Sequence, residues 1–348
     1  MFKLVLLSLA SGLSGQTADE ESKQPFTYNT SSTIAISQLV NQVDTLNLQG
    51  KVGRVSYPLP VPRPQYKIPA SEVRYFLQHS LLASCTAMQI QSNKCFCKEK
   101  FKTPRLFRDV LLDAHGAVAV DVSNKLVVVS YRDSVSQRNW DLNNDSRLSE
   151  YPGSSTHVTD TQGEHESASK PDSSRTPRVH RGHLRYFKAI HPPMEPFVVR
   201  HLQNPAYSGY RLHVTGYGFG ASVAAISLPK WHNALQSRSL NNKIRLYSYS
   251  GPRPGNLAYA KYLETLNITM VRYTKRGDVV PLTPDQNMGY SQVGQELYDN
   301  SPLVYMNSLV SCSPNVVEDK ACSLSDSFFL PYHHTIPFHK PMPIPPFC

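Results

Sequence analysis

The chain has 348 residues, of which 40% are hydrophobic and 18% charged, and its formal net charge is +10. This composition is that of a globular protein with one large domain or two smaller ones. It does not favour nucleic-acid binding, because the basic residues are scattered and no aromatic RNA-binding signature accompanies them. The charge suits a basic soluble surface or attraction to anionic lipid or cell-wall surfaces.

The N-terminus, MFKLVLLSLASGLSG, combines an early lysine, a short apolar run and small residues. This pattern is typical of a secretory signal peptide, so we predict that residues 1–15 are removed and that the protein is extracellular. Secretion favours disulfides, and six cysteines fit three bridges, although their spacing leaves the pairing open. Residues 16–68 are polar and then proline-rich, and they predict a propeptide or a disordered N-terminal arm.

From residue 69 onward, apolar periods of helix and strand alternate. The first predicted elements are a helix capped by Ser71, strands at 116–121 and 125–131, and a polar surface insertion at 143–178. Order returns at Val179, and a helix follows that is interrupted near Pro192 and Pro193 and resumes at Phe197–Leu202. The remaining elements are a strand, turn and helix at Leu212–Ala225, a strand at Ile244–Tyr249, a helix at Leu257–Leu266 and a strand at Thr269–Tyr273. This alternation predicts an α/β fold with a mostly parallel central sheet and helices on both faces.

Leu212–Ala225 reads LHVTGYGFGASVAA and has glycines at 216, 218 and 220. We interpret it as a strand that turns sharply into a helix, because such a turn brings the two backbones too close for a Cβ atom. In α/β-hydrolases the same turn is written G-x-S-x-G, and the central serine is the nucleophile. Here Gly218 occupies that central position.

Acyl transfer also needs an acid, a histidine and oxyanion donors. In α/β-hydrolases the acid follows the turn in the chain, and the histidine follows the acid. Asp278 follows a predicted strand, where this fold places its acid. The alternative interpretation is an ordinary turn aspartate before a proline-containing loop. His333 and His334 lie in PYHHTIPF and fit a catalytic base, an incidental metal pair or two surface histidines. Ser134 follows another strand and can complete an oxyanion hole with the Phe219 N–H, or it is an ordinary turn serine.

Five segments of the chain resemble segments of one known family and occur in the same order along the chain. They are KLVVVSYRDSVSQRNWDL, VHRGHLRYF, LHVTGYGFGASVAA, LYSYSGPRPGNLAYAKYL and RYTKRGDVVPLTP. The chain resembles the fungal secreted triacylglycerol lipases of the class 3 type, specifically the zygomycete branch, from about Ser71 to Cys348 with a gap at the polar insertion. The resemblance implies a lipase-like α/β-hydrolase domain over residues 69–348, an N-terminal propeptide, and a lipid or acyl ester ligand met at a lipid–water interface. We expect a monomer without metal or cofactor.

The resemblance also implies roles for individual positions. They are Gly218 as the vacant nucleophile position, Asp278 as the acid, His334 as the histidine with His333 as the runner-up, Ser134 and Phe219 as oxyanion donors, and a lid helix over Gln137–Leu142 with Trp140. The implied disulfides are Cys85–Cys348, Cys95–Cys97 and Cys312–Cys322, and the middle pair has one intervening residue where the family has two.

The departures from the family all touch the acyl-transfer machinery. Gly218 replaces the nucleophilic serine, Tyr217 replaces the preceding histidine, and Asp133 puts a negative charge near the oxyanion position. We therefore predict a lipase-like protein that is inactive or weak and retains lipid binding. The alternatives are an active esterase that uses another nucleophile, Ser222 or Ser250, and a non-enzymatic protein that binds lipid or cell surfaces.

Overall fold

The computed structural model describes residues 54–59, 65–85, 101–152, 176–301 and 309–334. Within these residues an eight-stranded sheet forms the centre of the molecule, and a small four-stranded antiparallel sheet lies beside it. Strands β3, β6, β7, β9 and β11 of the large sheet run parallel. Antiparallel pairs complete its edges, so the predicted α/β fold with a mostly parallel sheet is confirmed.

The larger sheet contains, in spatial order, β1 (Lys102–Asp109), β2 (Ala114–Asp121), β3 (Leu126–Tyr131), β6 (Arg211–Tyr217), β7 (Ile244–Tyr249), β9 (Thr269–Lys275), β11 (Gln295–Asp299) and β12 (Leu309–Ser311). The smaller sheet contains β10 (Tyr290–Ser291), β8 (Gly255–Asn256), β5 (Arg178–His180) and β4 (Leu148–Glu150). The α-helices are α3 (Ala70–Ser80), α5 (Gln137–Asn144), α6 (Arg181–Gln203), α7 (Phe219–Gln236) and α8 (Leu257–Glu264).

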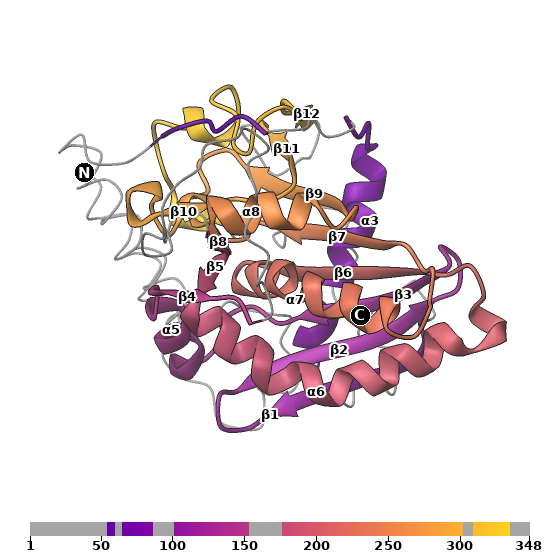
Figure 1. Ribbon diagram of the computed structural model, residues 1–348. Coiled ribbons are helices and arrows are strands. Elements are labelled where there is room, and N and C mark those ends of the chain that lie inside the picture. Colours follow the sequence, from indigo (N-terminus) through magenta and orange to yellow (C-terminus); the bar gives the residue numbers. More distant parts are fainter. Residues whose placement is uncertain (1–53, 60–64, 86–100, 153–175, 302–308, 335–348) are drawn as a thin grey trace, which may run out of the picture.

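Helices cover both faces of the large sheet (Figure 1), as expected for strands that are apolar on both sides. Helices α6, α7 and α8 pack on one face, where Ile190, Met194 and Trp231 are fully buried. Helix α3 packs on the other face through Val73, Phe76 and Leu77. The site that follows lies at the edge of the sheet between these layers.

The start of helix α3 differs from the sequence prediction. Helix α3 begins at Ala70 after Pro69, and no side chain caps it, so the predicted cap by Ser71 is wrong. Proline suits the start of a helix, since an N–H missing there breaks no intrahelical bond. Helix α6 begins at Arg181, and the His180 ring accepts from the His183 N–H.

Helix α6 also continues through its prolines, contrary to the predicted interruption. Pro192 and Pro193 are exposed, whereas Ile190, Met194 and Val198 on the opposite side are completely buried. A proline inside a helix costs about 3 kcal/mol. Burial of an apolar stripe that runs through both halves of α6 offsets this cost, because each buried large side chain contributes about 1.5–3 kcal/mol.

Part of the predicted N-terminal arm is ordered against the domain. Pro58 forms a β-bridge with Val316, and the Leu59 N–H donates to the Asn315 carbonyl at 2.9 Å. Leu59 is also buried in the main core. Residues 54–59 of the predicted propeptide or disordered arm are thus docked against the domain, and residues 1–53 lie outside the described part of the chain.

The predicted Cys312–Cys322 disulfide is present. Cys85 is disulfide-bonded as well, whereas its predicted partner Cys348 lies outside the described residues. The predicted Cys95–Cys97 pair also lies outside them. None of the described helices is long and apolar enough to cross a membrane.

Candidate active site

The turn that the glycines predict joins β6 to α7. Gly218 has φ +51°, in the left-handed region that favours glycine. The flanking glycines are required by close packing, because a Cβ at Gly216 would lie 2.3 Å from the backbone of Gly220, and one at Gly220 would lie 2.1 Å from the Tyr131 carbonyl oxygen. The glycine at the centre is thus held at the tip of a tight strand-to-helix turn.

Parallel pairing brings three chain segments to the same edge of the sheet. Strands β3, β6 and β9 all end there, and Asp133, Gly218 and Asp278 follow within three residues of the respective strand ends. In open α/β sheets this carboxyl edge is where ligand sites form. The fold therefore assembles the candidate residues from distant parts of the sequence.

The structure brings Asp278 and His334 together. His334 Nδ1 lies 3.0 Å from Asp278 Oδ2, and both residues are buried. His333 instead directs its Nδ1 to the carbonyl oxygen of Arg276. The Tyr217 hydroxyl donates to the His334 carbonyl oxygen, so the residue that replaces the family's histidine fixes the loop that carries His334.

The Asp133 carboxylate lies against the turn at Gly218 and accepts the backbone donors beside it. Its Oδ1 accepts hydrogen bonds from the Phe219 N–H at 2.8 Å and the Ser134 N–H at 2.7 Å. A Cβ built on Gly218 would lie 2.4–2.6 Å from the three carboxylate atoms of Asp133. The sequence indicated an unfavourable charge nearby, but it did not reveal that this charge takes the backbone donors itself.

The Ser134 side chain makes no hydrogen bond with the described residues. It is 1% exposed, and its hydroxyl has no hydrogen-bond partner among the described residues. The N–H of Phe219, which was the other predicted oxyanion donor, is already bonded to Asp133. The Phe219 N–H is therefore bonded to an internal anion, whereas the role of the Ser134 hydroxyl as a donor stays a prediction.

Asp133 also faces the other side of the histidine. Its Oδ2 lies 3.8 Å from His334 Nε2, so the ring is placed between two carboxylates. Burial favours the neutral ring, but the charges of Asp278 and Asp133 outweigh this effect and raise the pKa of His334 to about 10. His334 is consequently an imidazolium at neutral pH and holds no lone pair with which to accept a proton.

Parts of the chain are similar to known lipases. Residues 128–288 match the family described as "Lipase (class 3)". A lipase from Rhizomucor miehei is 26% identical over 210 residues, which are 60% of this chain and 52% of the relative. A secreted mono- and diacylglycerol lipase A from Penicillium cyclopium is 30% identical over 214 residues, which are 60% of this chain and 58% of the relative. The chain thus matches little more than half the length of these curated relatives.

A solved structure of a Rhizomucor miehei lipase propeptide complex superimposes with a TM-score of 0.60 at 22% identity, covering 81% of this chain and 84% of that one. This is the α/β-hydrolase fold. The sequence matches support the class 3 lipase family, and the structural match independently supports the fold.

In this lipase-like fold the predicted lid segment forms α5. Ser136 caps the helix, Gln137 is exposed, and Trp140 and Leu142 are buried. The C-terminal end of α5 touches the start of α6 through its backbone, because a Cβ on Gly182 would lie 1.7 Å from the Leu142 carbonyl oxygen.

A second hydroxyl–histidine pair, which the sequence did not indicate, lies under this contact. Ser222 Oγ is 2.7 Å from His183 Nδ1, and His183 Nε2 is 3.0 Å from Asn143 Oδ1. Because an amide oxygen can only accept, Nε2 carries the proton and Nδ1 accepts from Ser222. Burial lowers the pKa of His183 well below its ordinary value, so this ring is neutral. Ser250, the other alternative nucleophile, is completely buried.

One group of potential metal ligands occurs among the described residues, namely Glu296, Cys312 and Cys322. The two sulfur atoms are bonded to each other. A disulfide offers no thiolate, so this group does not have the chemistry of a metal site.

Proposed function

We propose that this protein is a lipase-fold protein that has lost serine ester hydrolysis and retains binding of lipid or acyl esters. The observation that carries the proposal is the Asp133 carboxylate, which lies against Gly218 and accepts the Phe219 N–H. An anion in this place repels the oxyanion that ester hydrolysis must create. The class 3 lipase matches supply the lipid ester as the ligand class.

Three requirements of acyl transfer fail together. Gly218 has no atom that can attack a carbonyl, His334 is protonated at neutral pH, and Asp133 holds the oxyanion donor. Removing the serine alone typically costs on the order of a million-fold in turnover, or roughly 8 kcal/mol of transition-state stabilisation. We therefore expect turnover near the uncatalysed background.

The direct test is hydrolysis of short- and long-chain nitrophenyl esters by the purified protein, with Rhizomucor miehei lipase as the active control. We expect hydrolysis at the level of buffer and no effect of a serine-directed phosphonate. Turnover comparable to the control enzyme, abolished by the phosphonate, would overturn the proposal.

The rival function is an active esterase with Ser222 as nucleophile, and the 2.7 Å contact with His183 favours it. Against it, Ser222 is 2% exposed and His183 is completely buried, so an ester cannot reach the hydroxyl in this conformation. Fluorophosphonate labelling followed by peptide mapping separates the two. Capture at Ser222 supports the rival, and an unlabelled protein supports the lost activity.

We further propose that the protein is secreted as a monomer after removal of residues 1–15. The N-terminal pattern of the sequence supports this, and one relative is described as secreted. Sequencing of the N-terminus of protein from culture medium tests the cleavage, and light scattering tests the mass. Lipid binding through the net charge of +10 is tested by co-sedimentation with anionic and neutral vesicles.

A further inference from the structure

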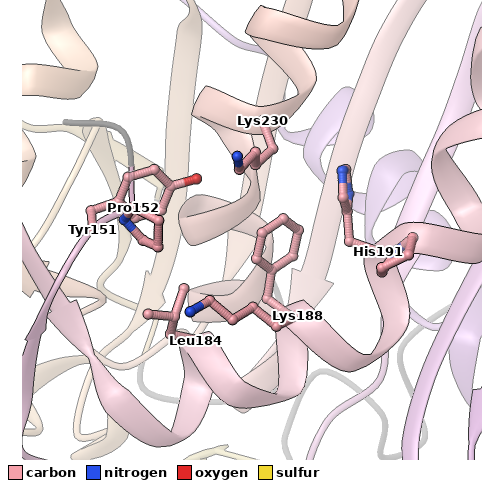
Figure 2. A pocket seen from close by; sticks show the side chains of 8 residues that line it. Tyr151, Pro152, Leu184, Lys188, His191 and Lys230 are labelled. Carbon is pink, nitrogen blue, oxygen red and sulfur yellow. The ribbon is translucent and has the colours of Figure 1, made fainter. Parts of the chain in front are cut away.

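A pocket of 280 Å³ opens between α6, α7 and the residues that follow β4, as Figure 2 shows. Lys188 and His191 of α6 line it together with Lys230 of α7. Lys230 lies 11 positions beyond Phe219 on α7, which corresponds to about 16 Å along a helix axis. The pocket is thus separate from the turn at Gly218.

The lining combines cations with apolar walls. The walls are formed by Pro152, Leu184, Phe187, Pro192 and the ring of Tyr151, and the polar groups are the two lysine ammoniums, the His191 ring and the Tyr151 hydroxyl. No carboxylate belongs to the residues that line the pocket. A cavity of this size is close to the lower end of small-molecule sites, which measure about 300–1,000 Å³.

His191 adds a second indication of a ligand. The residue is 7% exposed, and its Nδ1 is buried without a hydrogen-bond partner among the described residues. Its other nitrogen, Nε2, lies 3.0 Å from Glu195 Oε2 and donates to it. A buried polar atom without a partner costs about 1–3 kcal/mol. An anionic head beside Nδ1 would favour a proton on that atom and accept its hydrogen bond, which would remove the cost.

We propose that this pocket binds one single-chain fatty acid, with its carboxyl group at Lys188 and Lys230 and its chain against Leu184 and Phe187. Two ammoniums at the rim attract an anionic head. The apolar walls remove the chain from water at about 25 cal/mol per Å² of buried surface. The inference stands apart from the proposed loss of hydrolysis, because none of these residues belongs to the Asp133–His334 site.

Tryptophan fluorescence offers a local readout. The chain has two tryptophans, and the ring of Trp231 contacts the edge of the His191 ring at a centroid distance of 4.6 Å. In a Trp140→Phe background, titration with laurate should change the emission of Trp231 with saturation. Dodecylamine, which has the same chain and the opposite charge, should bind at least about tenfold more weakly.

Charge reversal then tests the site. Lys188→Glu combined with Lys230→Glu should weaken laurate binding at least about tenfold. The matched control, Lys102→Glu with Lys243→Glu, changes two exposed lysines elsewhere by the same total charge and should leave binding unchanged. The proposal is overturned if laurate does not bind, if dodecylamine binds equally well, or if both double variants behave alike.

Discussion

Two histidines of this molecule contact potential catalytic partners. His334 has carboxylate partners but no hydroxyl, and His183 has a hydroxyl partner but no access to solvent. His334 lies at the carboxyl edge of the sheet, between Asp278 and Asp133, with no hydroxyl beside it. His183 has a hydroxyl at 2.7 Å and a neutral ring, but it is completely buried under α5. Catalysis needs a hydroxyl, a neutral base, oxyanion donors and access in one place, and here they are divided between two places.

The proposed loss of hydrolysis is compatible with an intact fold. At the edge of the sheet, Asp133 satisfies the Phe219 N–H and the Ser134 N–H, which would otherwise be turned toward solvent or substrate. The imidazolium of His334 compensates the two carboxylates. Asp133, His334 and Asp278 thus form an ion-paired link between the turn and the segment that carries His334.

The largest predicted effect tests whether the edge site can be restored. Asp133→Gly combined with Gly218→Ser supplies a hydroxyl, frees the Phe219 N–H and lets His334 return toward neutrality. We expect ester hydrolysis at least about 10³-fold above the wild-type protein, measured with nitrophenyl butyrate.

Either single change should remain at background, since Gly218→Ser alone drives its Cβ into the Asp133 carboxylate. Adding His334→Ala to the double variant should abolish the gained activity. Activity in Gly218→Ser alone would show that Asp133 moves aside readily and would contradict the proposal that its carboxylate blocks the site.

A smaller effect concerns pH. Because the folded-state pKa of His334 is raised from 6.5 to about 10, the folded protein keeps a proton that the unfolded chain loses in this range. The stabilisation is complete below pH 6.5 and is lost as the pH rises toward 10, by at most about 1.4 kcal/mol per pH unit.

Urea denaturation of the wild type and His334→Gln at several pH values isolates this contribution, since other groups titrate in both proteins. The free energy of unfolding of the wild type should fall more steeply between pH 6.5 and 10 than that of the variant. Parallel curves would show that the ring is not held as an imidazolium.

The crowding at the turn is measured by Gly218→Ala, for which we expect a loss of about 3 kcal/mol in the free energy of unfolding. Gly209→Ala is the matched control, because Gly209 also has a positive φ, +76°, but a Cβ there meets no atom within 4 Å. The difference between the two variants reports the contact with Asp133. It should disappear in an Asp133→Gly background, and its persistence would argue against that contact.

The smallest effect concerns the buried pair. Ser222→Ala leaves His183 Nδ1 without its donor and should cost about 1–2 kcal/mol of stability, with no change in esterase background. Ser227→Ala on the same helix is the control, because the Ser227 hydroxyl donates to the Ala224 carbonyl, one turn earlier, and its other partner is Tyr131 rather than a histidine. Equal losses in both variants would mean that the His183 contact contributes nothing.

The sequence predicted the turn at Gly218 and the nearby Asp278 and His334 because those signals are local or ordered along the chain. Glycine spacing reveals a close strand-to-helix approach, and residues after parallel strands must meet at one edge. The position of the Asp133 side chain could not be predicted, since a carboxylate beside an oxyanion hole can turn away from it or accept its donors.

The sequence did not predict that α6 continues past its prolines or that Ser222 contacts His183, and the reason is related. Continuation of the helix past Pro192 and Pro193 depends on burial of the opposite stripe, which only the packed structure determines. Likewise, the contact between Ser222 and His183 joins two helices, and the sequence of neither helix determines their relative position.

The docking of residues 54–59 bears on maturation. Arg54 donates to the carbonyl oxygens of Leu324 and Asp326, at 3.2 and 2.8 Å, and the Val317 N–H donates to the Tyr57 carbonyl at 2.9 Å. A protease that cut between residues 59 and 65 would therefore nick the molecule without stripping the leading peptide from it. The product would be a two-chain complex that separates on a denaturing gel and travels as one particle in native buffer.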